Sequence, residues 1–181
     1  MNGMNMHQDI KEILISEEQV TAKCKELAKQ IDEDYAGQTI LLVGLLKGSV
    51  PFMAELGKYL TSDVRFSYMN VSSYEGMESK TLVVKQDLEE DISGQHLLLV
   101  EDIIDTGKTL MNVKQMLEKR NAKSVKIVTL LDKEEARIFE MQADYVGFRI
   151  PKAFVVGYGL DFNERYRQLP YIGILKEDCY K

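Results

Sequence analysis

The sequence places acidic, hydroxyl and lysine side chains in one short segment directly after an apolar run. Glu101 and Asp102 follow the leucine-rich stretch 97–100, two isoleucines come next, and the segment closes on Asp105 and on Thr-Gly-Lys-Thr at 106–109. Backbone N–H groups at a helix start, with a glycine that allows close approach, suit a phosphate group. Adjacent carboxylates beside it suit a hydroxyl-rich sugar or Mg²⁺. The segment therefore predicts binding of a ribose phosphate together with Mg²⁺.

The Gly-Lys-Thr ending also invites comparison with the phosphate loop of nucleoside-triphosphate enzymes. That loop needs a glycine five positions before Gly107, and the sequence has Asp102 there. Taken singly, each acid is better explained as a solvated charge, or Asp105 as a helix N-cap. The whole combination after a buried strand favours a functional site.

The elements expected around this segment alternate between strand and helix. Ser16 and Gln19 have the spacing of a capping box, so the first expected element is a helix that begins near Ser16. Further helices are expected at 51–60 and 105–120. Continuous apolar runs predict strands covered on both faces. The expected strands are 39–46, 64–73, 81–86, 96–102, 124–132, 145–151, 154–161 and 171–176, with 64–73 and 81–86 forming a hairpin.

This order predicts a single α/β domain over residues 1–181, with a mostly parallel twisted sheet flanked by helices. In such sheets, ligands bind beyond the carboxyl ends of the strands. Three suggestive segments lie at those ends, namely 46–49, 101–109 and 130–133. Their convergence indicates where the site should be.

Composition narrows the class of protein. The chain has 181 residues, 45% of them hydrophobic and 29% charged, which predicts a folded core rather than disorder. A formal net charge of -6 argues against a protein that binds nucleic acid non-specifically. The apolar runs are shorter than the roughly 20 residues of a membrane span, and the first residues do not resemble a secretory signal. We therefore expect no nucleic-acid or membrane partner.

Cysteine usage points to a reducing compartment. There are two cysteines, Cys24 and Cys179, and they are not spaced like a metal clamp. Cys24 falls on the apolar face of the first helix, together with Val20 and Leu27, so we expect it to be a small buried hydrophobe. The expected localisation is cytoplasmic, with both thiols free.

The segment 100–110, Val-Glu-Asp-Ile-Ile-Asp-Thr-Gly-Lys-Thr-Leu, resembles the phosphoribosyl-pyrophosphate signature of type I phosphoribosyltransferases. The resemblance covers most of the chain from about residue 41. In order and spacing it resembles the hypoxanthine-guanine branch, and the block 154–175 is what narrows it to 6-oxopurine enzymes. The other matching segments are 45–49, 72–74, 130–133 and 145–151.

The resemblance implies both an activity and an architecture. Such enzymes transfer ribose 5-phosphate from phosphoribosyl pyrophosphate to N9 of hypoxanthine, guanine or both, forming IMP or GMP and pyrophosphate in purine salvage. It implies Mg²⁺ as cofactor and assembly as a homodimer or homotetramer. It also implies a small hood subdomain, made of a mobile loop at about 72–80 and of elements from both terminal segments.

On the sugar side, the resemblance implies that Glu101 and Asp102 lie near the ribose hydroxyls and Mg²⁺. Asp105 corresponds to the proton acceptor at the purine ring, and 106–109 to the cradle of the 5-phosphate. Asp161 corresponds to a ligand of a second Mg²⁺.

The other implied roles concern pyrophosphate and the base. Lys47, Gly48 and Arg167 correspond to pyrophosphate contacts, and Ser73 and Tyr74 would close over that group. Lys133 would donate to the purine O6, Phe154 would stack on the base, and Val155 would contact its edge through the backbone. The full expected substrate-binding set is Lys47, Gly48, Ser73, Tyr74, Glu101, Asp102, Ile104, Thr106, Gly107, Lys108, Thr109, Lys133, Phe154, Val155 and Arg167.

Two other functions are open to the same sequence. One is a non-catalytic regulator that keeps the sugar-phosphate site and binds nucleic acid, against which the net charge and the lack of a basic cluster count. The other is a phosphoribosyltransferase for adenine or pyrimidines. Lys133, followed by Phe154 and Val155, favours a 6-oxo base, because an ammonium donor prefers a carbonyl oxygen to an amine.

Overall fold

The computed structural model describes residues 6–75 and 80–180 and contains two sheets. The larger sheet has six strands in the order β4-β3-β2-β5-β6-β7. All neighbours in it are parallel except β4, which pairs antiparallel with β3. Its strands are β2 (Thr39–Leu45), β3 (Asp63–Glu75), β4 (Lys80–Gln86), β5 (His96–Ile104), β6 (Ser124–Asp132) and β7 (Tyr145–Arg149). The expected α/β fold with a mostly parallel sheet is confirmed.

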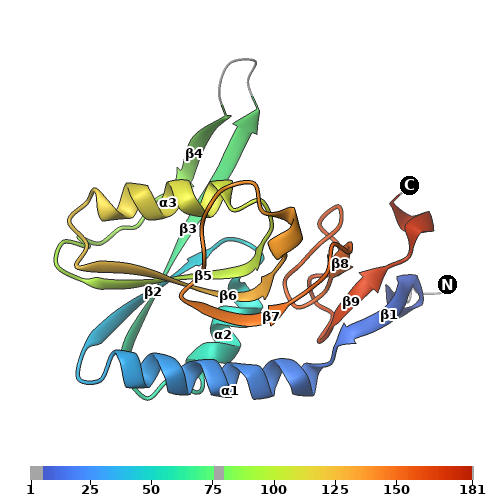
Figure 1. Ribbon diagram of the computed structural model, residues 1–181, viewed down its shortest axis with the longest axis horizontal. Helices are drawn as coiled ribbons and strands as arrows, with labels where there is room; N and C mark the ends of the chain where they lie inside the picture. The colour runs from blue at the N-terminus through green and yellow to red at the C-terminus, as the bar shows by residue number, and fades with distance from the viewer. Residues whose placement is uncertain (1–5, 76–79, 181) are drawn as a thin grey trace.

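Helices cover both faces of this sheet (Figure 1). On one face lie α1 (Glu17–Asp34) and α2 (Val50–Gly57), and on the other lies α3 (Lys108–Glu118). The buried strand β5 contributes Leu98 and Val100 to the core under α1 and α2, and Leu97 and Leu99 to the core under α3. A strand covered on both faces has no polar side, which explains its continuous apolar run.

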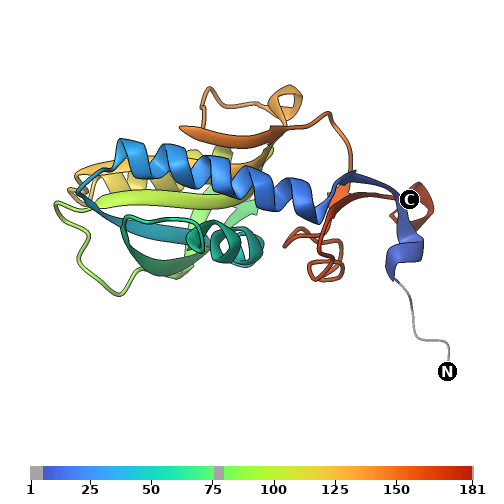
Figure 2. The same cartoon turned by 90° about the horizontal axis from the view of Figure 1, so that it is seen from below.

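A second, three-stranded antiparallel sheet lies at one end of the molecule, beside both termini (Figures 1 and 2). Its order is β1-β9-β8, from β1 (Ile10–Ile15), β9 (Ile172–Leu175) and β8 (Val155–Val156). Short 3-10 turns complete the description, at Met6–Asp9, Glu134–Ala136 and Glu177–Cys179. Between them, the terminal segments supply β1 and β9 of this sheet.

The first helix forms as the sequence predicts. Ser16 is its N-cap, and a complete capping box joins Ser16 and Gln19. The predicted inner face is buried, and it consists of Val20, Cys24, Leu27, Ala28 and Ile31. Burial, and then the negative charge of Glu55, raise the pKa of the Cys24 thiol to about 12. Cys24 is therefore an unreactive core residue at neutral pH.

Several predicted boundaries are wrong. The strand β1 precedes the first expected element; its pairing partner β9 comes from the other end of the chain, so no local pattern marks it. The third helix begins at Lys108 rather than Asp105, because Gly107 takes a left-handed conformation with φ of 84°. The strand predicted at 154–161 spans only Val155–Val156, since the chain turns with positive φ at Gly157, Tyr158 and Gly159.

The predicted hood loop at 72–80 overlaps two paired strands, and its role as a hood stays a prediction. Residues 72–75 belong to β3 and residue 80 to β4, and their backbones pair in antiparallel register. The remainder of that loop, 76–79, lies outside the described residues. Within the part of the chain that the structure describes, no helix is long and apolar enough to cross a membrane.

The end of α1 is joined to the start of β3 through one carboxylate. Asp32 Oδ2 accepts hydrogen bonds from the Thr61 amide at 2.9 Å and the Thr61 hydroxyl at 2.8 Å, and Oδ1 accepts from the Ser62 amide at 2.9 Å. Burial opposes ionisation of Asp32, but the hydrogen bonds from Ser62 and Thr61 outweigh it and lower its pKa. The ionised carboxylate therefore stabilises this connection.

We predict that Asp32→Ala lowers the free energy of unfolding by about 1 kcal/mol at neutral pH. Because the folded-state pKa is lowered, this stabilisation is present above the ordinary aspartate pKa of about 3.9 and is lost as the pH falls through the folded value. Urea titrations at about pH 7 and about pH 3 should show the difference shrinking. A difference of equal size at both values would contradict the prediction.

Glu33→Ala is the matched control. The Glu33 side chain is 67% exposed, and its ion pair with Lys29 is 3.9 Å long. Exposed pairs contribute little, so the free energy of unfolding should change by less than about 0.5 kcal/mol.

Candidate active site

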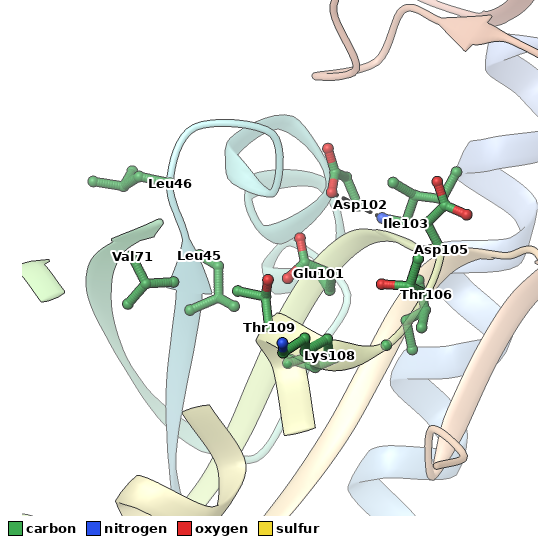
Figure 3. A pocket seen from close by; sticks show the side chains of 13 residues that line it. Leu45, Leu46, Val71, Glu101, Asp102, Ile103, Asp105, Thr106, Lys108 and Thr109 are labelled. Carbon is green, nitrogen blue, oxygen red and sulfur yellow. Dashed lines mark hydrogen bonds between the residues drawn. The ribbon is translucent and has the colours of Figure 1, made fainter. Parts of the chain in front are cut away.

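A cavity of about 300 Å³ opens at the carboxyl ends of β2 and β5 (Figure 3). The end of β5 and the turn that follows it, 101–110, supply most of the lining, and Leu45, Leu46 and Val71 supply the rest. The sequence predicted a site where these strand ends meet. The cavity therefore coincides with the segment whose residue types suggested chemistry.

The turn between β5 and α3 is anchored by the loop 133–141, which follows β6. Asp105 and Thr106 are exposed, and Gly107 is buried as the N-cap of α3. The Thr106 carbonyl accepts hydrogen bonds from the amides of Ile138 at 3.2 Å and Phe139 at 3.3 Å. The backbone of the predicted phosphate cradle is thus anchored, while its polar side chains face the cavity edge in Figure 3.

Gly107 is required for two reasons. Its φ of 84° is left-handed, and a Cβ there would lie 2.8 Å from Met141 Sδ and 3.2 Å from Arg137 Cδ. Thus only a residue without a side chain permits the turn and its packing against the 137–141 loop.

Two acids lie side by side at the end of β5. Asp102 is buried, and its Oδ1 accepts a hydrogen bond from the Ile103 amide at 2.8 Å. Burial, and then the negative charge of Asp102, raise the pKa of Glu101 well above its usual value. Two acids that compete to be ionised in one place form a site that a cation would stabilise. Among the described residues there is no group of three acidic, histidine or cysteine side chains that could hold a metal ion.

The loop that follows β2, residues 46–49, contacts the acid Asp102 at the end of β5. The Leu46–Lys47 peptide bond is cis. A Cβ on Gly48 would overlap Asp102 Oδ2, so this carboxylate lies against the Gly48 backbone. The Ser49 hydroxyl donates to the Leu45 carbonyl at 2.7 Å, which closes the loop on itself. The predicted pyrophosphate loop and the predicted ribose acids are therefore neighbours.

A third segment, 157–169, packs on the same loop. A Cβ on Gly159, whose φ is 99°, would overlap the Gly48 carbonyl oxygen. The Gly159 carbonyl in turn accepts a hydrogen bond from Arg167 Nη1 at 2.7 Å. The close approach of the two backbones brings Arg167 to the side of the loop that carries Lys47.

Glu164 connects the two predicted pyrophosphate cations, and the sequence analysis missed it. Its carboxylate lies 2.7 Å from Lys47 Nζ and 3.1 Å from Arg167 Nη2. Hydrogen bonds from Lys47, and then from Arg167, lower the pKa of Glu164. Arg167 Nη2 also lies 3.0 Å from Asp161 Oδ1, while the Glu164 amide donates to Asp161 Oδ2 at 2.9 Å. Glu164 gave no signal in the sequence because it lies in an ordinary charged loop.

The residues predicted to contact the base come from two different parts of the fold. The Lys133 amide donates to the Ile104 carbonyl at 3.0 Å, which places the start of the 133–141 loop beside the turn. Phe154 and Val155 instead belong to the small sheet, where Val155 is buried and Phe154 is 38% exposed. The described lining of the cavity includes none of Lys133, Phe154 and Val155.

Two further predicted contacts, Ser73 and Tyr74, lie in β3, which also carries the cavity residue Val71. Their closure over pyrophosphate stays a prediction, as do the substrate and metal roles of the other residues. The ion pair of buried Asp132 with Arg137 was also missed. It joins the end of β6 to the loop that braces Gly107.

Comparison with known proteins supplies the family context. Residues 11–163 match the family model of the phosphoribosyl transferase domain. A hypoxanthine-guanine phosphoribosyltransferase of Streptococcus pneumoniae is 53% identical over 97% of this chain and 98% of its own length. One from Streptococcus mutans is 49% identical over the same shares. A crystal structure of a hypoxanthine phosphoribosyltransferase from Staphylococcus aureus, 45% identical, superposes with a TM-score of 0.94 over 100% of this chain and 99% of that one.

The close approach of Gly159 to Gly48 leads to a prediction about stability. Gly159→Ala should lower the free energy of unfolding by about 3 kcal/mol, because a left-handed alanine is strained and its Cβ displaces backbone. Gly37→Ala is the control, since Gly37 has φ of 73° and nothing within 4 Å of an added Cβ. The Gly37→Ala substitution should lower the free energy of unfolding by only about 1 kcal/mol. Urea titrations that gave both variants the same loss would refute the close contact.

Proposed function

Because the chain belongs to the phosphoribosyltransferase family, we propose that it transfers ribose 5-phosphate from phosphoribosyl pyrophosphate to N9 of hypoxanthine and guanine. The products are IMP or GMP and pyrophosphate, and the reaction requires Mg²⁺. One observation carries the proposal beyond family membership. The Asp102 carboxylate lies against the Gly48 backbone, so the segment suited to a sugar phosphate and the loop suited to its pyrophosphate share one edge of the sheet.

The turn 106–109 binds the 5-phosphate of the sugar in this proposal. The N–H groups at the start of α3 point out of the helix without helical partners, and the helix dipole favours an anion there. Gly107 lets the phosphate approach the backbone. Thr106 and Thr109 add hydroxyl donors, and Lys108 adds positive charge.

The acids then act on the ribose. As the bond to pyrophosphate breaks, the anomeric carbon gains positive charge, and the carboxylates of Glu101 and Asp102 stabilise it by their field. Mg²⁺ in proteins is held by one or two carboxylates and by substrate phosphate oxygens, which fits a pair of acids without a third protein ligand. When bound, it neutralises charge on the pyrophosphate. Asp161 is proposed as a ligand of a second Mg²⁺, and its carboxylate is oriented by Arg167 and by the Glu164 amide.

Lys47 and Arg167 stabilise the negative charge on the departing pyrophosphate, together with the Gly48 backbone. A guanidinium suits this role because it donates two parallel hydrogen bonds. Glu164 holds both cations on one side of the loop in the substrate-free protein. Ser73 and Tyr74 are proposed to close over the same group and exclude water, which would otherwise attack the cationic sugar.

The base is recognised by groups of two kinds. Lys133 donates to the purine O6, and the backbone of Val155 contacts the ring edge, whereas Phe154 stacks on the ring face. Asp105 accepts a proton from the purine ring, a role for which its exposed position at the turn is suitable. We further propose that the protein acts in the cytoplasm as a homodimer or homotetramer, which light scattering of the purified protein would distinguish from a monomer.

The activity itself is the first test. The purified protein with phosphoribosyl pyrophosphate and Mg²⁺ should release pyrophosphate when hypoxanthine or guanine is added, and much less with adenine or orotate. Removal of Mg²⁺ with EDTA should abolish release, and excess Mg²⁺ should restore it. Inactivity with hypoxanthine, guanine and xanthine alike would reject the proposal. Salt-sensitive RNA binding by the same sample would favour the regulator instead.

Asp105→Asn tests the proton acceptor. The amide keeps the shape of the side chain but cannot take the proton, so kcat should fall by about 100-fold. The KM for phosphoribosyl pyrophosphate should change little, because the phosphate cradle is intact. Steady-state kinetics with hypoxanthine measure both constants, and an unchanged kcat would exclude this role. The circular dichroism spectrum should match that of the wild-type protein.

A further inference from the structure

Tyr180, in the turn that follows β9, stacks on Phe154, the side chain to which we assign stacking on the purine base. The Phe154 and Tyr180 ring centroids are 4.8 Å apart, and the ring planes differ by 17°. Tyr180 lies outside every motif that pointed to the active site. Its contact with Phe154 is therefore not explained by the proposed reaction.

Both rings are held by the small sheet. The Phe154 carbonyl accepts a hydrogen bond from the Leu175 amide at 3.0 Å, just before β8 begins. After β9 the chain turns back, with the Cys179 amide bonded to the Lys176 carbonyl at 3.0 Å and the Tyr180 amide to the Glu177 carbonyl at 3.1 Å. The turn that follows β9 thus places the Tyr180 ring against Phe154.

A third ring, Phe162, lies close to Phe154, and its distances show which part of Phe154 it contacts. The Phe162 centroid is 5.5 Å from Phe154 and 6.4 Å from Tyr180, with interplanar angles of 86° and 70°. A ring over the far face of Phe154 would be much farther from Tyr180 than from Phe154. Phe162 therefore lies beside the stacked pair and not over the far face of Phe154, and Phe154 is 38% exposed.

We propose that Tyr180 is a positioning residue for the purine: it covers one face of Phe154, so that the base stacks on the opposite face. This inference rests on the proposed function. Offset aromatic stacking stabilises a ring pair beyond the area it buries, and Tyr180 restricts the tilt of Phe154 before the base arrives. A pre-oriented ring binds the base with less loss of conformational entropy.

The proposal predicts a selective effect on the base. In Tyr180→Ala, the KM for hypoxanthine and for guanine should rise together by about three- to tenfold. Their ratio should be unchanged, because stacking does not distinguish the ring edges. The KM for phosphoribosyl pyrophosphate should stay within about twofold of the wild-type value. Tyr180→Phe keeps the ring and should restore wild-type constants.

Asp178→Ala is the matched control. Asp178 is exposed in the same C-terminal turn, and its removal should leave all the constants unchanged. If Tyr180→Ala does not fold, Tyr180→Leu keeps an apolar side chain without an aromatic face and should show the same rise in KM for the base. Thermal denaturation of each variant establishes that the compared samples are folded.

Three results would overturn the inference. An unchanged KM for both bases would show that Phe154 needs no backing ring. A lower KM would mean that Tyr180 occupies the place of the base in the free protein. Equal rises in KM for the base and for phosphoribosyl pyrophosphate would reveal a general structural defect. An active wild-type enzyme with any of these results rejects only the Tyr180 role, whereas an inactive wild-type protein rejects the proposed function.

Discussion

The burial of β5 between two apolar layers is the constraint on which the site depends. Leu98 and Val100 point into the core beneath α1 and α2, while Leu97 and Leu99 point into the core beneath α3. Each fully buried side chain of this size contributes about 1.5–3 kcal/mol relative to an exposed one. The strand is therefore fixed on both sides, and the polar residues at its carboxyl end emerge at that end of the sheet. Glu101 and Asp102 are consecutive residues there, so both acids are placed at the site by the same strand.

The polar groups around that edge are organised by electrostatics rather than by packing. Asp102 lies against the Gly48 backbone, and Glu164 bridges Lys47 and Arg167. The bridging side chains are partly or largely exposed, so each pair contributes little to folding. Their contribution is arrangement: two acids lie together at the end of β5, and the ion pairs hold Lys47 and Arg167 beside the neighbouring loop. Preorganised charges of this kind act on the transition state without reorganising during the reaction.

The ring proposed to stack on the base is held by aromatic packing rather than by ion pairs. Phe154, Phe162 and Tyr180 form an aromatic cluster on the small sheet, whereas Lys133 lies at the end of the large one. In the proposed function, the large sheet carries the contacts to the sugar phosphate, and the small sheet carries the ring that stacks on the base. The cavity at the end of β5 therefore does not by itself contain all the predicted contacts.

The order of most elements and the position of the turn between β5 and α3 could be predicted from the sequence, because both follow from local patterns. Apolar runs of strand length mark the buried strands, the capping box marks α1, and 105–109 combine the residue types that an anion site needs. Small errors, such as the start of α3, arose where one glycine conformation decided the boundary. Substrate-side roles came from the family resemblance and not from periodicity.

Only the tertiary structure decided the contacts between segments far apart in the chain. β1 pairs with β9 across most of the sequence, Glu164 meets Lys47 over 117 positions, and Tyr180 covers Phe154. None of these contacts leaves a local signal in the sequence, because each residue meets its partner only after the chain has folded. The sequence by itself determined which chemical groups are present and at which strand end they emerge. Packing of the two sheets determined which of those groups face one another, since the energy of a contact depends on distance in space and not along the chain.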